Sequence, residues 1–200
     1  MLTYAPGYYY GNRQPSPHCW TTSMVKLNQN LRVLWEQHVY WTRKAMTSIV
    51  AGLPDEQETL KRLLRNPADF AAALRPFYGP NVANRFASLF TDHLTIAAEL
   101  IRALKSGNSA AAADARKRWF ANADDIAVFL SRINPYWPEA EWKKMLYEHL
   151  NLLARAVSAR LSGNHALYVE LGDPIELQAL GMADMMTAGI VRQFPNAFIA

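Results

Sequence analysis

The chain has 200 residues, half of them apolar and 19% charged, with a formal net charge of +4. This composition is typical of a globular protein with one substantial core, and the small charge excess argues against a nucleic-acid partner. The single cysteine, Cys19, cannot form an internal disulfide, which favours a reducing compartment. The sequence shows neither a secretory signal nor an apolar run long enough for a bilayer, so we expect a cytoplasmic protein without a membrane partner.

Residues 1–23 are rich in tyrosine, proline and glycine and show no periodic apolar face. Proline and glycine disfavour a helix, and a segment without an apolar face has little to bury. We therefore predict a flexible tail over 1–23 and a single helical-bundle domain over 24–200. The tyrosines suit contacts with other protein surfaces, so protein partners through the tail and a homo-oligomer are both expected.

From residue 27 onward, apolar residues recur at helical spacing, and glycine or proline marks the ends of each segment. Asn66-Pro67 predicts a break within the second helix, and Gly172-Asp173-Pro174 predicts the start of the last main helix near residue 173. No segment alternates as a strand does. The predicted fold class is all-α, a bundle of about six helices over residues 27–51, 55–77, 81–105, 110–133, 139–161 and 166–194.

The chain also repeats itself. Residues 62–108 align with residues 118–164 at a constant offset and without a gap. A third and weaker copy, around His38, aligns with the copy around His93 at nearly the same offset. In every copy a histidine precedes a glycine by the same distance along the chain: His38 and Gly52, His93 and Gly107, His149 and Gly163. Self-similarity of this period is typical of duplicated helical hairpins, so we predict three antiparallel hairpins.

Each of the three histidines follows apolar residues by three and four positions, which predicts that all three point from the apolar face into the interior. The intervening helices carry carboxylates in related places. Imidazole and carboxylate groups inside a bundle suit iron, zinc, manganese or copper, although the Glu-x-x-His pair of di-iron bundles is missing. The candidate metal ligands are His38, His93, His149, Asp69, Asp125 and Asp184.

The alternative is that the histidines are structural residues. Each ring would then donate one N–H to a carboxylate or a backbone carbonyl of a neighbouring helix, and duplication would have copied this contact. Asn66 and Asn122 lie three residues before Asp69 and Asp125 and present a similar choice. They belong either to a shared polar cavity, or to a helix cap at Asn66 and an interior hydrogen bond at Asn122.

Four segments of the chain resemble a family of helical proteins from spore-forming bacteria that has no established activity. They are LWEQHVYWTR at 34–43, RLLRNP at 62–67, RPFYG at 75–79 and INPYW at 133–137. The resemblance implies an all-helical protein and a spore-associated role. Members often carry the label acetylglutamate kinase, which implies an α/β fold with glycine-rich phosphate loops; this sequence has neither, and that activity is not expected. A looser likeness to ferritin-like and spore-coat-associated bundles implies a metal or a structural role.

Two functions follow from the sequence. The first is a non-enzymatic helical bundle with a structural or protein-interaction role. The second is a metal-binding bundle, ferritin-like in character, that uses the core histidines and aspartates. No catalytic motif is found, which leaves open whether the protein is an enzyme, and the identity of any cofactor is equally open. The irregular spacing of the ligands favours the first function.

Overall fold

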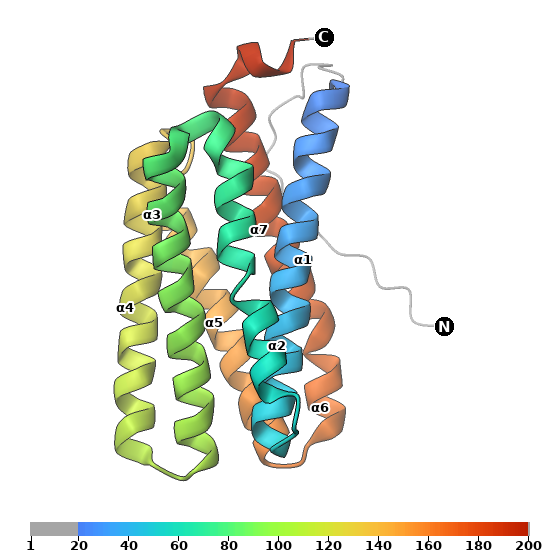
Figure 1. Cartoon of the computed structure of the whole chain (residues 1–200), viewed down its shortest axis with the longest axis vertical. Coiled ribbons are helices and arrows are strands. Elements are labelled where there is room, and N and C mark those ends of the chain that lie inside the picture. Colours follow the sequence, from blue (N-terminus) through green and yellow to red (C-terminus); the bar gives the residue numbers. More distant parts are fainter. Residues whose placement is uncertain (1–19, 200) are drawn as a thin grey trace.

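The structure is a computed structural model that describes residues 20–199 (Figure 1). Every regular element in this range is a helix and no strand is present, which confirms the all-α prediction for these residues. The elements are α1 (Thr22–Ala51), α2 (Glu56–Leu63), α3 (Asn66–Lys105), α4 (Ser109–Ile133), α5 (Glu139–Leu161), α6 (His165–Glu170), α7 (Gly172–Gln193) and the 3-10 helix η1 (Pro195–Phe198). The predicted tail falls mostly outside the described residues, and α1 begins two residues before the predicted domain boundary.

Proline and glycine divide the helices where the sequence predicts. α3 begins with Asn66 and Pro67, shortly after α2 ends at Leu63. Within α3, Gly79 has φ 76° and ψ 171°, a conformation that L-residues rarely adopt, and the chain reverses its direction there (Figure 1). α3 therefore has two arms, a first arm over 66–78 and a second arm over 80–105.

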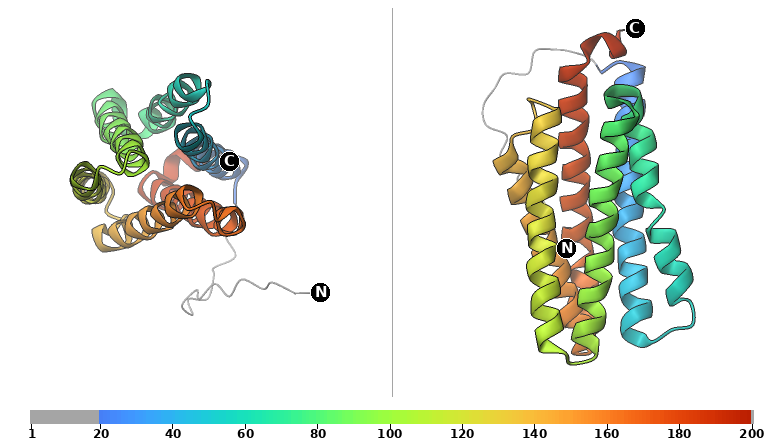
Figure 2. Two further views of the ribbon diagram at one scale, coloured as in Figure 1. Left: turned by 90° about the horizontal axis from the view of Figure 1, so that it is seen from below. Right: turned by 60° about the vertical axis from the view of Figure 1, so that its left-hand side comes forward.

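The helices that carry the three histidines run in the same direction along the bundle. They are α1, the second arm of α3 and α5, whereas α2 with the first arm of α3, α4 and α7 run the opposite way (Figures 1 and 2). The glycines of the repeat lie at equivalent ends of the histidine-bearing helices. Gly52, Gly107 and Gly163 have φ between 65° and 74°, so all three helices end in a left-handed residue.

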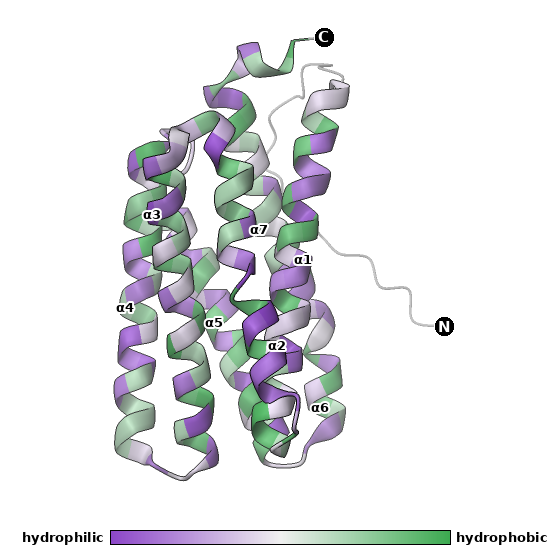
Figure 3. Ribbon diagram, in the orientation of Figure 1, coloured by the Kyte–Doolittle hydropathy of each residue, from purple (hydrophilic) through white to green (hydrophobic). Residues whose placement is uncertain are grey.

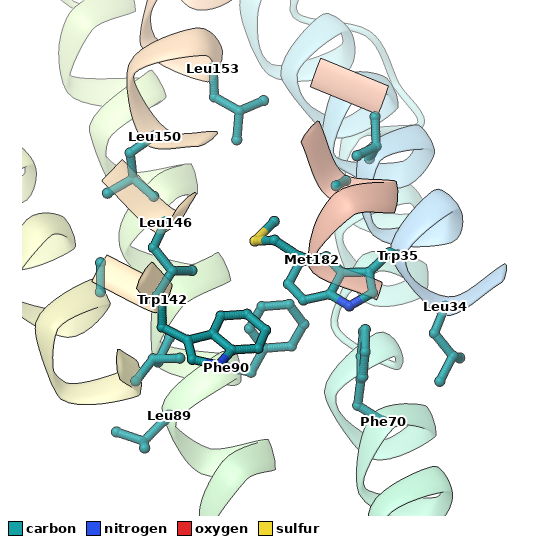
Figure 4. Close-up of a cluster of buried hydrophobic side chains, with 14 of the residues drawn as sticks. Leu34, Trp35, Phe70, Leu89, Phe90, Trp142, Leu146, Leu150, Leu153 and Met182 are labelled. Carbon is teal, nitrogen blue, oxygen red and sulfur yellow. The ribbon is translucent and has the colours of Figure 1, made fainter. Parts of the chain in front are cut away.

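The core is formed by apolar side chains from the inner faces of these helices. Hydrophobic and hydrophilic residues alternate along each helix in Figure 3, as expected of amphipathic helices. Large rings and aliphatic chains meet at the centre, among them Trp35, Phe70, Phe90, Trp142 and Met182 (Figure 4). Full burial of such a side chain contributes about 2 kcal/mol to folding. No helix within residues 20–199 has the length and apolarity needed to cross a membrane.

Candidate functional site

The three histidines of the repeat all lie in the core. His38 on α1, His93 on the second arm of α3 and His149 on α5 are each 1% exposed. The prediction that all three rings point into the interior is confirmed. Helical spacing explains this result, because each ring lies on the same face as apolar residues one turn before it.

His93 is held by an amide rather than by a carboxylate. The side chain of Asn122 on α4 donates from Nδ2 to the backbone oxygen of Leu89 at 3.0 Å, and its Oδ1 lies 2.8 Å from His93 Nδ1. Because Oδ1 can only accept, Nδ1 of His93 carries the ring proton and Nε2 keeps a lone pair. We call this contact the His93–Asn122 pin. It confirms the interior hydrogen bond predicted for Asn122.

His149 repeats this arrangement with a longer amide. Gln178 on α7 donates from Nε2 to the backbone oxygen of Met145 at 2.8 Å, and its Oε1 lies 2.8 Å from His149 Nδ1. The same reasoning places the ring proton of His149 on Nδ1 and leaves Nε2 as an acceptor. In both copies the carbonyl that orients the amide belongs to the residue four positions before the histidine.

The first copy has the same parts but lacks the contact to the histidine. Asn66 donates from Nδ2 to the backbone oxygen of Leu34 at 3.0 Å, again four residues before the histidine. Asn66 lies close enough to His38 to raise the pKa of its ring, against the larger effect of burial. Yet both Asn66 Oδ1 and His38 Nδ1 are buried without a hydrogen-bond partner in the described part of the chain. Asn66 is also not the cap of α3, since it is fully buried and Arg65 occupies the cap position.

The rings of His38 and His149 face each other. Their Nε2 atoms are 3.3 Å apart, and the ring planes are tilted by 36°. We call these two residues the His38–His149 pair. Since Nε2 of His149 has no proton, a hydrogen bond across this gap needs the single proton of His38 on its Nε2. His38 Nδ1 is then an acceptor beside Asn66 Oδ1, which is also an acceptor.

The hydrogen bonding of His38 is therefore incomplete. A neutral His38 has one ring proton but two acceptors nearby, so one of its two contacts stays unfavourable whichever tautomer it adopts. Burial keeps the pKa of His149 at about 3, helped by repulsion from a charged His93. Burial, followed by repulsion from His149 and His93, holds the pKa of His38 well below its ordinary value. His38 therefore does not take up a second ring proton at neutral pH.

Aromatic rings pack around the histidines. Phe90 stacks on His38 with ring centroids 5.0 Å apart and on His93 at 6.0 Å. Trp35 contacts His38 edge-on at 5.5 Å, and Trp119 lies 5.5 Å from His93. Apart from the imidazoles and their amides, the surroundings are apolar, and electrostatic interactions are strong in such an environment.

The predicted carboxylates do not join the histidines. Asp184 accepts hydrogen bonds from Arg32 at 2.7 and 2.8 Å, and Asp69 pairs with Arg65 at 3.1 Å. Asp125 is exposed. Within residues 20–199 no group of three or more histidine, cysteine, aspartate or glutamate residues is arranged to hold a metal ion, so the predicted six-ligand set is not assembled. The physical reason is desolvation: a neutral amide can be buried with its hydrogen bonds made, whereas a buried carboxylate costs far more.

Gln178 was missed although the sequence contains a signal for it. The offset that relates Asn66 to Asn122, applied once more, leads to Gln178. At a slightly longer offset, Ala183-Asp184 in α7 matches Ala123-Asp124 in α4, and this competing match favours Asp184 over Gln178. Glutamine has the same side-chain amide as asparagine, one methylene further from the backbone. The third position is therefore recognised by its amide group and not by an identical residue.

Comparison with known proteins adds no assignment: no protein-family model, no curated protein and no solved structure matches the chain. The fold and the site define the class as an all-helical bundle with paired imidazoles in its core. The likeness to helical proteins of spore-forming bacteria stays a prediction.

Proposed function

We propose that the protein is a metal-binding helical bundle that holds one transition-metal ion between His38 Nε2 and His149 Nε2. The observation that carries this proposal is the 3.3 Å separation of the two buried nitrogens. When a four-coordinate tetrahedral ion binds nitrogen at about 2.0–2.1 Å, two of its ligand nitrogens lie about 3.3 Å apart. The pair thus has the spacing of two ligands of one ion.

The amides support the same proposal. A histidine that binds a metal through Nε2 usually donates its other ring N–H to an oxygen, which fixes the tautomer and the ring orientation. Gln178 already fills this role for His149. With an ion bound at Nε2, the proton of His38 moves to Nδ1 and faces Asn66 Oδ1. One cation would therefore remove the conflict between acceptors in the first copy of the motif.

The chemistry of the donors narrows the class of ion. Neutral imidazole suits zinc and copper, whereas magnesium, calcium and manganese prefer oxygen ligands. The described residues supply two imidazoles without a neighbouring carboxylate or thiolate. The remaining coordination positions would then have to be filled by small exogenous ligands that enter the core, since the described residues offer only these two imidazoles.

A structural role is the second candidate, and the His93–Asn122 pin favours it. There Nδ1 of the ring and both ends of the amide have partners, so this copy needs no ion to satisfy them. An amide side chain donates to the carbonyl four residues before the histidine in all three copies, and in two of them it also contacts the ring; this recurrence supports the interpretation of duplicated hairpins. The structural or interaction role expected from sequence would apply to the whole protein if the His38–His149 pair bound no metal.

The proposal is tested by zinc titration of the full chain without an affinity tag. His18→Ala and Cys19→Ser provide a background free of the two metal-binding side chains that precede residue 20. We expect one equivalent of zinc to bind by calorimetry, and cobalt(II) in its place to give the intense absorption of a tetrahedral ion. His149→Gln removes one ligand and should abolish binding. His93→Gln alters the same motif outside the pair and should retain it.

Two results would overturn the proposal. One is a well-folded wild-type chain that binds neither zinc nor copper(I) saturably. The other is zinc binding that survives His149→Gln, which would place the ion elsewhere. Circular dichroism of both glutamine variants separates loss of the site from loss of the fold.

A further inference from the structure

A cavity of about 410 Å³ lies at the end of the bundle where α3 ends and α4 begins, the lower end in Figure 1. Its walls come from α1, the second arm of α3, α4 and α5. Thr42, Ala97 and Leu153 line it, and each follows one of the three histidines by four residues. The cavity therefore begins one helical turn beyond the histidine cluster.

The walls of the cavity are almost entirely apolar, and short side chains on one side leave it open. Leu100, Ile101 and Leu104 form one wall, and Leu104 is 41% exposed. Ala112 and Ala113 lie on α4, in the alanine-rich stretch that is a good helix former but fills little core volume. What distinguishes this space from other hollows of similar volume on the described residues is that its lining is almost entirely apolar. Its volume lies within the range of small-molecule sites.

One charged residue lines this cavity, Arg116, which is itself an exposed residue. Its Cζ lies 4.9 Å from the ring centroid of Phe120, and none of the ion pairs formed within residues 20–199 involves it. Asp114 of the same helix and Glu99 of α3 instead accept hydrogen bonds from Arg118. The cavity thus combines apolar walls with a positive charge that has no acidic partner in the described chain.

We propose that this cavity binds an amphipathic anion, a monocarboxylate with an apolar chain or ring. The apolar part would lie between Leu100, Ile101 and Val157, and the carboxylate would pair with the guanidinium of Arg116. Burial of the apolar part supplies affinity, and the guanidinium selects for the anion. This inference goes beyond the proposed metal site and does not depend on it.

Calorimetry with decanoate, and with 1-decanol as a neutral probe of the same chain length, tests the charge. We expect saturable binding of decanoate to the full chain. Arg116→Gln should weaken decanoate binding about fivefold, the value of an ion pair worth about 1 kcal/mol, and should leave decanol binding unchanged. Lys117→Gln removes a neighbouring exposed charge that does not line the cavity and should change neither affinity.

A second pair of variants tests the location. Ala113 and Ala111 are both exposed on α4, but only Ala113 lines the cavity. Ala113→Phe should weaken decanoate binding at least about tenfold by filling the space, because about 1.4 kcal/mol or more of apolar contact is lost. Ala111→Phe should not affect it. Thermal unfolding of both variants shows whether each remains folded.

Three outcomes would overturn the inference. The first is that decanoate saturates no site, and the second is that Ala113→Phe and Ala111→Phe bind it equally. The third is that this face binds a second copy of the chain, in which case sedimentation without decanoate would show a dimer that Ala113→Phe dissociates. His149→Gln should leave decanoate binding intact, so failure of the metal site and failure of this cavity are distinguishable.

Discussion

The His93–Asn122 pin and the His38–His149 pair are built from copies of the same motif, yet their hydrogen bonding differs. Nδ1 of His93 has an amide oxygen 2.8 Å away. Nδ1 of His38 has no partner among the described residues, and its Nε2 faces another imidazole. The contrast shows that equivalent residues of a repeated sequence pattern differ in their hydrogen bonding where two imidazoles meet.

Phe90 lies between the two regions and stacks on both His38 and His93. It separates a ring that has a partner at Nδ1 from a pair in which Nδ1 of His38 has none among the described residues. Equivalent substitutions on the two sides of Phe90 should therefore have effects of different size.

Removal of the amide should lower the free energy of unfolding most at the His93–Asn122 pin. Asn122→Ala leaves His93 Nδ1–H buried without a partner and leaves the oxygen of Leu89 with its helical hydrogen bond alone, and we expect the metal-free protein to lose about 3 kcal/mol of unfolding free energy. Asn66→Ala breaks only the bond to Leu34, since Asn66 Oδ1 already lacks a partner, and should cost about half as much. Urea denaturation measures both. Equal losses would mean that the two copies are equivalent, contrary to the comparison.

Acid should destabilise the protein through the pin. Burial lowers the pKa of His93 to about 4, whereas an unfolded histidine titrates near 6.5. Between these values the unfolded chain binds a proton that the folded chain does not. The contribution of His93 to stability is therefore complete above about pH 6.5 and falls by about 3 kcal/mol as the pH approaches 4. His93→Gln should reduce the stability difference between pH 7 and pH 4.5; an unchanged difference would rule out a buried neutral ring.

Gln178, the amide of the third copy, should affect the affinity of the proposed site for zinc. Gln178→Leu removes the acceptor of His149 Nδ1, and such outer partners typically change metal affinity by about 10- to 100-fold. Asn122→Leu makes the matching change at the pin and should leave zinc affinity within about twofold, because His93 lies outside the pair. Competition with a chromophoric chelator measures both affinities. A similar loss in both variants would count against a two-histidine site.

Substitution of the predicted carboxylates should have the smallest effects on stability and on zinc affinity. Asp184→Asn removes the negative charge of the ion pair with Arg32, whose side chain is 39% exposed. Partly exposed ion pairs contribute little, so the loss of stability should be below about 1 kcal/mol, and zinc affinity should not change. Asp125→Asn, at an exposed residue, is the matched control. A large fall in zinc affinity with Asp184→Asn would restore the carboxylate to the site and contradict the arrangement described.

Sequence periodicity predicted the helices and the inward direction of the three rings, because a face of a helix is defined by residues three and four apart. It also predicted the break at Asn66-Pro67 and the interior bond of Asn122. It did not determine which helices become neighbours. The meeting of His38 with His149, rather than with His93, depends on long-range packing that spacing along one helix does not encode.

The residue pattern also did not predict that amides, and not carboxylates, would lie beside the buried histidines. Asp69 and Asp125 lie only three residues from Asn66 and Asn122, so both residue types share roughly one face. The cost of desolvation decides which of them is buried. Asn66 is fully buried, while Asp125 stays exposed. An interpretation based on titratable groups alone overlooked the neutral side chains that orient the rings.

The most direct test is anomalous diffraction at the zinc absorption edge from crystals of the zinc-loaded full chain. The account predicts one peak between His38 Nε2 and His149 Nε2, with His38 Nδ1 now within hydrogen-bond distance of Asn66 Oδ1. A peak at any other position, or no peak in this gap at saturating zinc, would contradict it.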